Sequence, residues 1–381
     1  MKRLLFILMS LTIISCSKKT NNTQKENVTK ELDSLLLSTF KMDEPGGSVL
    51  LKKNGETVFM KSYGVEDITT GKKITENTIF NTGSISKTFV SNGILILQEQ
   101  GKLSIEDSIY KYFNDFDNKE IAQKVKIKHM LSHTSGLPDL RNVRDNIEFF
   151  MTAKDTANFE PLKRTDSLNF QSGERFQYSN PSYNGLALII EGLAEKKWQD
   201  FIKEQIFQPS GMENSKITDG PYPETGVAHA YYKDDEGKYV EYDYGEFTTF
   251  TASGNGGIWS SVLELAKYEE AIRKNTFLSK ELTEESRKPY YPKNWSDTIP
   301  PNIGYSWFTG DRRFVSDKIP SLDVNVIYHT GSQGGFKAFL ISIPEKDIVF
   351  IGLFNKYRSN LNEIMNTTLQ NLKKNNWLDI Q

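Results

Sequence analysis

The 381-residue sequence contains very little cysteine and histidine. Cys16 is the single cysteine, so the chain cannot form an internal disulfide or a Cys-based metal cluster. The four histidines are His129, His133, His229 and His329. Few side chains that bind transition metals are therefore present, and no metal or other cofactor is expected.

The sequence also lacks an excess of charge and a long apolar run. It has 47 Lys and Arg against 49 Asp and Glu, a formal net charge of −2, which argues against a nucleic-acid-binding protein. The mean hydropathy of −0.51 and a single apolar run exclude a multi-span membrane protein. A hydrophobic fraction of 37% is enough for a sizeable core, and the length allows one large domain or two or three small ones.

The first residues have the features of an export signal. Lys2 and Arg3 precede an apolar run over residues 4–15, which is too short to span a bilayer of about 30 Å. A basic start, a short apolar middle and small residues after it are typical of a secretory signal peptide.

Cys16 lies directly after this run. Residues 13–16, Ile-Ile-Ser-Cys, resemble the lipobox of bacterial lipoproteins. The resemblance implies a signal peptide over residues 1–15, lipidation of Cys16, and an exported protein anchored to a membrane on its periplasmic or surface face. The alternative is ordinary cleavage near Ser15 or Ser17, with Cys16 discarded or free. Residues 17–27 contain no apolar side chain, so residues 16–28 are expected to be the lipidated cysteine and a flexible tether.

Strand patterns occur at both ends of the remaining chain. Residues 48–53 and 56–63 are strand-like and flank Asn54-Gly55, a strong hairpin signal because both turn residues need positive φ. Further strands are predicted over 324–328, 336–343 and 348–354. Strands from the two ends most economically form one sheet.

Helical patterns flank and separate these strands. Helices are predicted over residues 28–40, 84–100 and 359–377, and residues 186–190 belong to a buried helix. The predicted fold is α/β of the α+β type, an antiparallel sheet flanked by helices. A mostly helical lobe is inserted at about 102–290 within one domain of residues 29–381.

Ser84 and Lys87 form a candidate nucleophile and base. They lie three residues apart where a helix is predicted to begin, so the lysine amine can reach the serine hydroxyl. Burial would lower the lysine pKa toward that of a usable base. The Ser-x-x-Lys pattern occurs four times in the chain, so it is not specific alone.

Two further segments carry candidate residues. A phenol such as Tyr178 held near ammonium groups can have a lowered pKa and move a proton, and the amide of Asn180 can bind a substrate amide. His329, Thr330, Gly331 and Ser332 follow at the end of a predicted strand, where a backbone N–H could stabilise an oxyanion. A purely structural role remains open for each segment taken alone.

Four segments taken together resemble the serine β-lactamase-related family, which includes class C β-lactamases, D-Ala-D-Ala carboxypeptidases, D-aminopeptidases and related esterases. The resemblance extends from about residue 33 to residue 355. The segments are TGSISKTF at 82–89, LSHTSGLP at 131–138, GERFQYSN at 173–180 and HTGSQGGF at 329–336.

The resemblance implies a role for each matching residue and a β-lactamase/transpeptidase-like fold. Ser84 would be the acylated nucleophile, Lys87 would activate it, and Tyr178 would protonate the leaving group. Asn180 would bind the substrate amide. The backbone N–H groups of Ser84 and Ser332 would form the oxyanion hole.

His329 stands where class C β-lactamases usually have lysine, and with Thr330, Gly331 and Ser332 it would line the substrate site. This difference favours a D-amino-acid peptidase, carboxypeptidase-like enzyme or esterase acting on a small-molecule or peptide substrate, which could derive from peptidoglycan. A β-lactamase, a penicillin- or peptidoglycan-binding protein with little turnover, and a lipoprotein that scaffolds partners remain alternatives.

Other catalytic arrangements are less well supported. His129 and His133 have helical zinc-ligand spacing, but Met130 stands where a His-Glu-x-x-His motif has glutamate. His133 also belongs to a segment that looks structural in the resembling family. No Gly-x-Ser-x-Gly string is present, which argues against an α/β-hydrolase.

Overall fold

The computed structural model of the chain describes residues 23–141, 146–218, 227–241, 252–310, 321–357 and 359–379. The expected signal peptide and Cys16 lie outside the described residues. Within the described ranges, no helix is both long and apolar enough to cross a bilayer.

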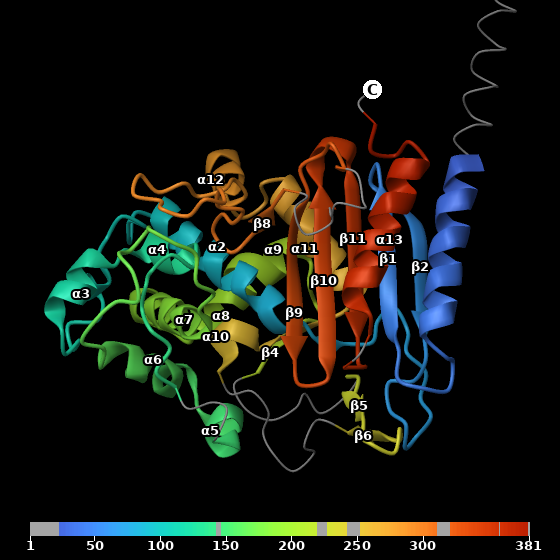
Figure 1. Cartoon of the computed structure of the whole chain (residues 1–381), viewed down its shortest axis with the longest axis horizontal. Coiled ribbons are helices and arrows are strands. Elements are labelled where there is room, and N and C mark those ends of the chain that lie inside the picture. Colours follow the sequence, from blue (N-terminus) through green and yellow to red (C-terminus); the bar gives the residue numbers. More distant parts are fainter. Residues whose placement is uncertain are drawn as a thin grey trace, which may run out of the picture.

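Six antiparallel strands form the main sheet, in the order β2-β1-β11-β10-β9-β8 (Figure 1). The strand next to the N-terminal hairpin comes from near the C-terminus, with pairs that run from Gly47–Phe354 to Lys53–Ile348. The prediction of one sheet built from both ends of the chain is confirmed. Its strands are β1 (Gly47–Lys53), β2 (Glu56–Tyr63), β8 (Phe308–Thr309), β9 (Ile327–Gln333), β10 (Phe336–Ile343) and β11 (Ile348–Phe354).

The turns of the sheet show which boundaries the sequence predicts well. Asn54 and Gly55 have φ of 52° and 77°, as the predicted hairpin requires. The strand expected over 324–328 instead spans β9, because residues up to Gln333 pair with β10 before the turn at Gly334. Residues 329–332 therefore belong to the end of β9 itself, and the predicted end of this strand at residue 328 is wrong.

Helices cover both faces of the sheet. A helix over residues 23–39 and α13 (Leu361–Lys374) pack on one face, where their apolar residues join those of β10 and β11 in one buried cluster. α11 (Val262–Arg273) contacts β1 and β11. The described part of the N-terminal helix already includes residues 23–27, which precede the expected start at residue 28.

A mostly helical lobe lies between β2 and β8 in the sequence and beside the sheet in space (Figure 1). α7 contacts α2, α4, α6, α8 and α10 and is the centre of this lobe. Its helices are α2 (Ser86–Glu99), α3 (Lys119–Lys124), α4 (Ile127–Leu131), α5 (Ile147–Thr152), α6 (Asp155–Lys163), α7 (Asn180–Ala194), α8 (Trp198–Ile202), α9 (Gln208–Ser210), α10 (Ser253–Gly256) and α12 (Lys280–Ser286).

The chain between β2 and β8 also forms strands of two or three residues, which the sequence pattern did not predict because they depend on tertiary pairing. They are β3 (Phe80–Asn81), β4 (Lys216–Ile217), β5 (Tyr231–Lys233), β6 (Tyr239–Glu241) and β7 (Ile258–Ser260). β3 leads into the 3-10 turn η1 (Gly83–Ile85), which contacts β9. This contact joins the lobe to the sheet and brings the candidate residues together.

Candidate active site

Ser84 and Lys87 lie on adjoining turns at the start of α2. Ser84 is the middle residue of η1, and Lys87 is the second residue of α2, so the helix begins two residues later than expected. Lys87 Nζ lies 3.0 Å from Ser84 Oγ, within hydrogen-bond distance. The three-residue spacing thus brings the amine to the hydroxyl.

Lys87 is fully buried, which is rare for a lysine. Its Nζ also donates a hydrogen bond of 2.8 Å to the carbonyl oxygen of Asn255 on α10. Burial holds the pKa of Lys87 well below its usual value, and the charge of Arg141 lowers it further. The neutral amine, which can accept a proton, is therefore favoured.

η1 and β9 approach so closely that the facing glycines cannot carry side chains. A Cβ on Gly331 would lie 2.0 Å from the Thr82 carbonyl oxygen, and a Cβ on Gly83 would lie 2.6 Å from the backbone nitrogen of Ser332. Gly83 also has φ of +54°, in the left-handed region. The contact sets the Ser84 turn directly against the strand at Ser332.

Tyr178 faces Ser84 and Lys87 from the loop before α7. Its ring centroid lies 5.2 Å from Lys87 Nζ, and its hydroxyl interacts with the Ser84 side chain. The expectation of a lowered pKa for Tyr178 is wrong. Although Tyr178 is 37% exposed along the cavity, desolvation around its hydroxyl raises its pKa. The nearby lysine favours its own neutral form, so it provides little charge to stabilise a phenolate.

His133 holds the Tyr178 loop in place. The two rings stack with centroids 4.2 Å apart. His133 Nδ1 accepts a hydrogen bond of 3.0 Å from Ser179 N, and its carbonyl oxygen accepts one of 2.8 Å from Gln177 N. His133 therefore fixes the residues on both sides of Tyr178, a role that the sequence analysis missed because the partners lie more than forty residues away.

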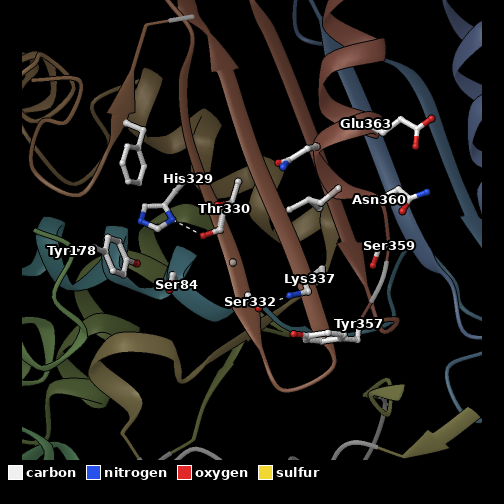
Figure 2. A pocket seen from close by; sticks show the side chains of 14 residues that line it. Ser84, Tyr178, His329, Thr330, Ser332, Lys337, Tyr357, Ser359, Asn360 and Glu363 are labelled. Carbon is white, nitrogen blue, oxygen red and sulfur yellow. Dashed lines mark hydrogen bonds between the residues drawn. The ribbon is translucent and has the colours of Figure 1, made fainter. Parts of the chain in front are cut away.

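His329 is buried on β9 at the wall of the site. Its Nδ1 lies 2.7 Å from the carbonyl oxygen of Thr330 (Figure 2), which can only accept, so Nδ1 carries a proton. In the neutral ring, Nε2 then has the lone pair. The ring of Phe308 lies 5.4 Å from the imidazole and forms the neighbouring wall.

A cavity of about 740 Å³ extends from Ser84 along β9 to the start of α13 (Figure 2). Lys87 is buried next to Ser84, whereas Asn180 is the half-buried first residue of α7 and is not among the lining residues. Binding of the substrate amide by Asn180 therefore stays a prediction. Its lining residues are Ser84, Tyr178, Phe308, His329, Thr330, Gly331, Ser332, Lys337, Tyr357, Ser359, Asn360, Leu361, Asn362 and Glu363.

The wall near α13 contains residues that the sequence analysis missed. Lys337 Nζ donates a hydrogen bond of 2.6 Å to Ser332 Oγ and lies 4.3 Å from the Tyr357 ring centroid. Lys337 pairs with Ser332 across β9 and β10. This register would have revealed the contact if the true end of β9 had been predicted.

The two histidines with zinc-ligand spacing do not form a common site. Their Nδ1 atoms accept backbone hydrogen bonds, His129 from Lys126 and His133 from Ser179. Across the described ranges, no group of three His, Cys, Asp or Glu side chains is placed to hold a metal ion.

Comparison with known proteins places this site in a family. The family model described as Beta-lactamase matches residues 37–373. Penicillin-binding protein 4* of Bacillus subtilis is 27% identical over 354 residues, which cover 87% of this chain and 73% of the relative. Protein flp of Staphylococcus aureus is 26% identical, and the match covers 87% of this chain but 64% of that protein.

Solved structures support the same fold. An octameric penicillin-binding protein homologue from Pyrococcus abyssi has a TM-score of 0.75 at 26% identity, covering 90% of this chain and 77% of its own. The D-amino acid amidase of Ochrobactrum anthropi has a TM-score of 0.71 at 19% identity, covering 94% of this chain and 99% of its own. On the strength of the family match over most of its length, the chain belongs to the Beta-lactamase family of serine hydrolases.

Proposed function

We propose that this protein is a serine hydrolase that forms an acyl-enzyme on Ser84, with D-amino-acid peptidase, carboxypeptidase-like or esterase activity. One observation carries the proposal: the buried amine of Lys87 lies 3.0 Å from Ser84 Oγ, beside a cavity large enough for a small substrate. A nucleophile next to a base with a lowered pKa is the arrangement that covalent catalysis needs.

Acylation follows from these positions. The neutral amine of Lys87 takes the proton of Ser84, and Oγ attacks the substrate carbonyl carbon. The backbone N–H groups of Ser84 and Ser332 stabilise the oxyanion, and the close contact of η1 with β9 supports this pairing. One such donor contributes about 3 kcal/mol to transition-state stabilisation.

Tyr178 protonates the leaving group in this mechanism. Its raised pKa keeps the phenol neutral, so it has a proton to donate. The bond from the carbonyl carbon to the leaving group breaks as that proton is transferred, and the proton on Lys87 restores the phenol. Water then attacks the acyl-enzyme with the same groups acting in reverse.

The substrate class is argued from the site and the relatives. The Bacillus subtilis relative is named as a penicillin-binding protein, and a solved protein of the same fold is a D-amino acid amidase. His329 forms the wall of the site where class C β-lactamases usually have a lysine, which favours peptide, amide or ester substrates. A β-lactamase, or a penicillin-binding protein with little turnover, is the second candidate, on the strength of the relative's name.

The proposal is tested by intact mass spectrometry of the full chain with benzylpenicillin, p-nitrophenyl acetate and a D-amino acid amide. The wild type is compared with Ser84→Ala and with Ser38→Ala. Ser38 is a matched control because it also begins a Ser-x-x-Lys pattern but lies exposed on the N-terminal helix. We expect an acyl adduct or hydrolysis that disappears only in Ser84→Ala.

The outcomes separate the candidates. A persistent penicillin adduct favours a cell-wall peptidase or a penicillin-binding protein, and consumption of the drug without an adduct favours a β-lactamase. Hydrolysis of the ester alone favours an esterase. Failure of all three compounds to give a Ser84-dependent adduct or product would contradict the proposal.

We also propose that the protein is exported and held at a membrane through lipid on Cys16. The position of the only cysteine after a short apolar run supports this. The full chain, expressed in bacteria, should partition into a detergent phase and carry an acyl mass increment. Cys16→Ala should abolish both, and equal partition of the two proteins would contradict lipid anchoring.

A further inference from the structure

Asp155 is a buried carboxylate that the proposed mechanism does not use. It is the first residue of α6 and is 7% exposed. Its oxygens accept four hydrogen bonds, from Asn184 Nδ2 at 2.6 Å, Trp198 Nε1 at 3.1 Å, Ser253 Oγ at 3.1 Å and Gly254 N at 2.9 Å. Asp155 therefore ties α6 to α7, α8 and α10 at one point.

A chain of hydrogen bonds leads from Asp155 to the candidate base. Asn184, which donates to Asp155, accepts a hydrogen bond of 3.0 Å at its Oδ1 from Asn255 Nδ2. The carbonyl oxygen of Asn255 accepts the hydrogen bond of 2.8 Å from Lys87 Nζ. All the intervening side chains are buried, so water does not compete for these bonds.

The position of the Asn255 carbonyl depends on contacts outside its own helix. α10 has only four residues, too few for a helix to be stable by itself. Asp155 binds its first two residues, Ser253 and Gly254. A Cβ on Gly254 would lie 2.8 Å from Ala187 Cβ, so α10 sits directly on α7 with no room to shift.

We propose that Asp155 is a positioning residue for Lys87. By holding Asn184 and α10, it fixes the Asn255 carbonyl that orients the lysine amine toward Ser84. This inference rests on the proposed function, in which Lys87 takes the Ser84 proton. A hydrogen bond from one N–H to the carbonyl limits rotation of the amine and leaves its lone pair directed at the hydroxyl.

The groups around Lys87 determine how displacement of the Asn255 carbonyl would change the lysine pKa. The rings of Tyr178 and Tyr183 lie 5.2 Å and 5.8 Å from Nζ, His133 is buried nearby, and Arg141 contributes a positive charge. A carbonyl that accepts a hydrogen bond favours the ammonium form. Displacing it should therefore lower the pKa of Lys87 further and also slow acylation.

The test uses full-length Asp155→Asn and Asn184→Leu, with Glu264→Gln as the matched control. Asn184→Leu breaks the chain of hydrogen bonds without changing charge. Glu264 is also a buried carboxylate that accepts backbone hydrogen bonds, from Asn214 N and Ser215 N, but it does not connect to Lys87.

Two readouts are measured on each protein. The acylation rate of Ser84 by p-nitrophenyl acetate is followed against pH. The Lys87 titration midpoint is followed by NMR of ε-¹³C-labelled lysine and assigned with Lys87→Met. We expect Asp155→Asn and Asn184→Leu to slow acylation about 10- to 100-fold, the range for a misplacement of up to 1 Å. KM should change little, and the midpoint should fall in both variants but not in Glu264→Gln.

Each result decides the inference. Wild-type rates and midpoints in folded Asp155→Asn and Asn184→Leu would overturn it, as would a rate loss shared with Glu264→Gln without a change in midpoint. If Asp155→Asn does not fold, Asn184→Leu decides alone. If the wild type shows no Ser84-dependent acylation, the proposed function fails, while the Lys87 midpoint still tests the positioning role.

Discussion

Replacement of Gly331 by alanine should separate the two backbone segments that form the oxyanion site. The added Cβ would lie 2.0 Å from the Thr82 carbonyl oxygen, whereas ordinary contacts begin at 3.4 Å. β9 and η1 must therefore move apart by more than 1 Å. Oxyanion donors act over about 2.7–3.1 Å, so this shift should remove one of them and slow acylation about 10²- to 10³-fold, or about 3–4 kcal/mol.

The measurement compares acylation rates and urea unfolding of Gly331→Ala with those of Gly192→Ala. A Cβ on Gly192, within α7, would meet no atom within 4 Å, so that variant should keep its rate and gain up to about 1 kcal/mol of stability. Gly331→Ala should lose about 1–3 kcal/mol through overpacking. A wild-type acylation rate in Gly331→Ala would refute the placement of the oxyanion hole between Ser84 and Ser332.

Three further predictions follow from buried groups. Lys87→Met should abolish acylation and flatten the pH dependence of the free energy of unfolding. In the wild type, folding lowers the pKa of Lys87, so the unfolded chain binds more protons than the folded chain. The free energy of unfolding therefore rises with pH up to about 10.4, by at most about 1.4 kcal/mol per pH unit. An unchanged slope in urea titrations at several pH values would contradict this. His133→Asn removes the ring that stacks on Tyr178, and asparagine tolerates the positive φ at this position. Because Tyr178 protonates the leaving group, and amides have a poorer leaving group than activated esters, amide hydrolysis should slow about 10-fold more than ester hydrolysis. Equal losses for both substrates would argue against this role. Arg287→Met leaves the buried Glu269 carboxylate without its partner and should lower the free energy of unfolding by about 3–5 kcal/mol; a loss below about 1 kcal/mol in urea would show that the pair is not needed.

Local patterns predicted the elements whose residues decide their own geometry. The Asn54-Gly55 hairpin forms because the turn residues favour positive φ, and strands β10 and β11 match their predicted ranges. The start of β9 was predicted too early because its extent depends on pairing with β10, which no local pattern contains.

In the candidate site, too, some features follow from local sequence and others depend on tertiary packing. The spacing of Ser84 and Lys87 on one helix start predicted their contact, since both belong to one short segment. The raised pKa of Tyr178 was not predictable, because it depends on desolvation of the hydroxyl by residues distant in sequence. The role of Asn180 in binding substrate stays a prediction.

The sequence by itself determined the antiparallel sheet, the helix that carries Lys87 and the residues that mark the family, because hydrophobic periodicity, turn chemistry and motif spacing are local properties. The tertiary structure decided which backbone approaches Ser84, how deeply Lys87 is buried, and how Asp155 and His133 reach the site. These depend on contacts between segments 29 to 249 residues apart, such as Asp155 with Asn184 and Gly83 with Ser332. Burial and close approach emerge only when such segments pack together, and they control the pKa values and donor positions on which the chemistry depends.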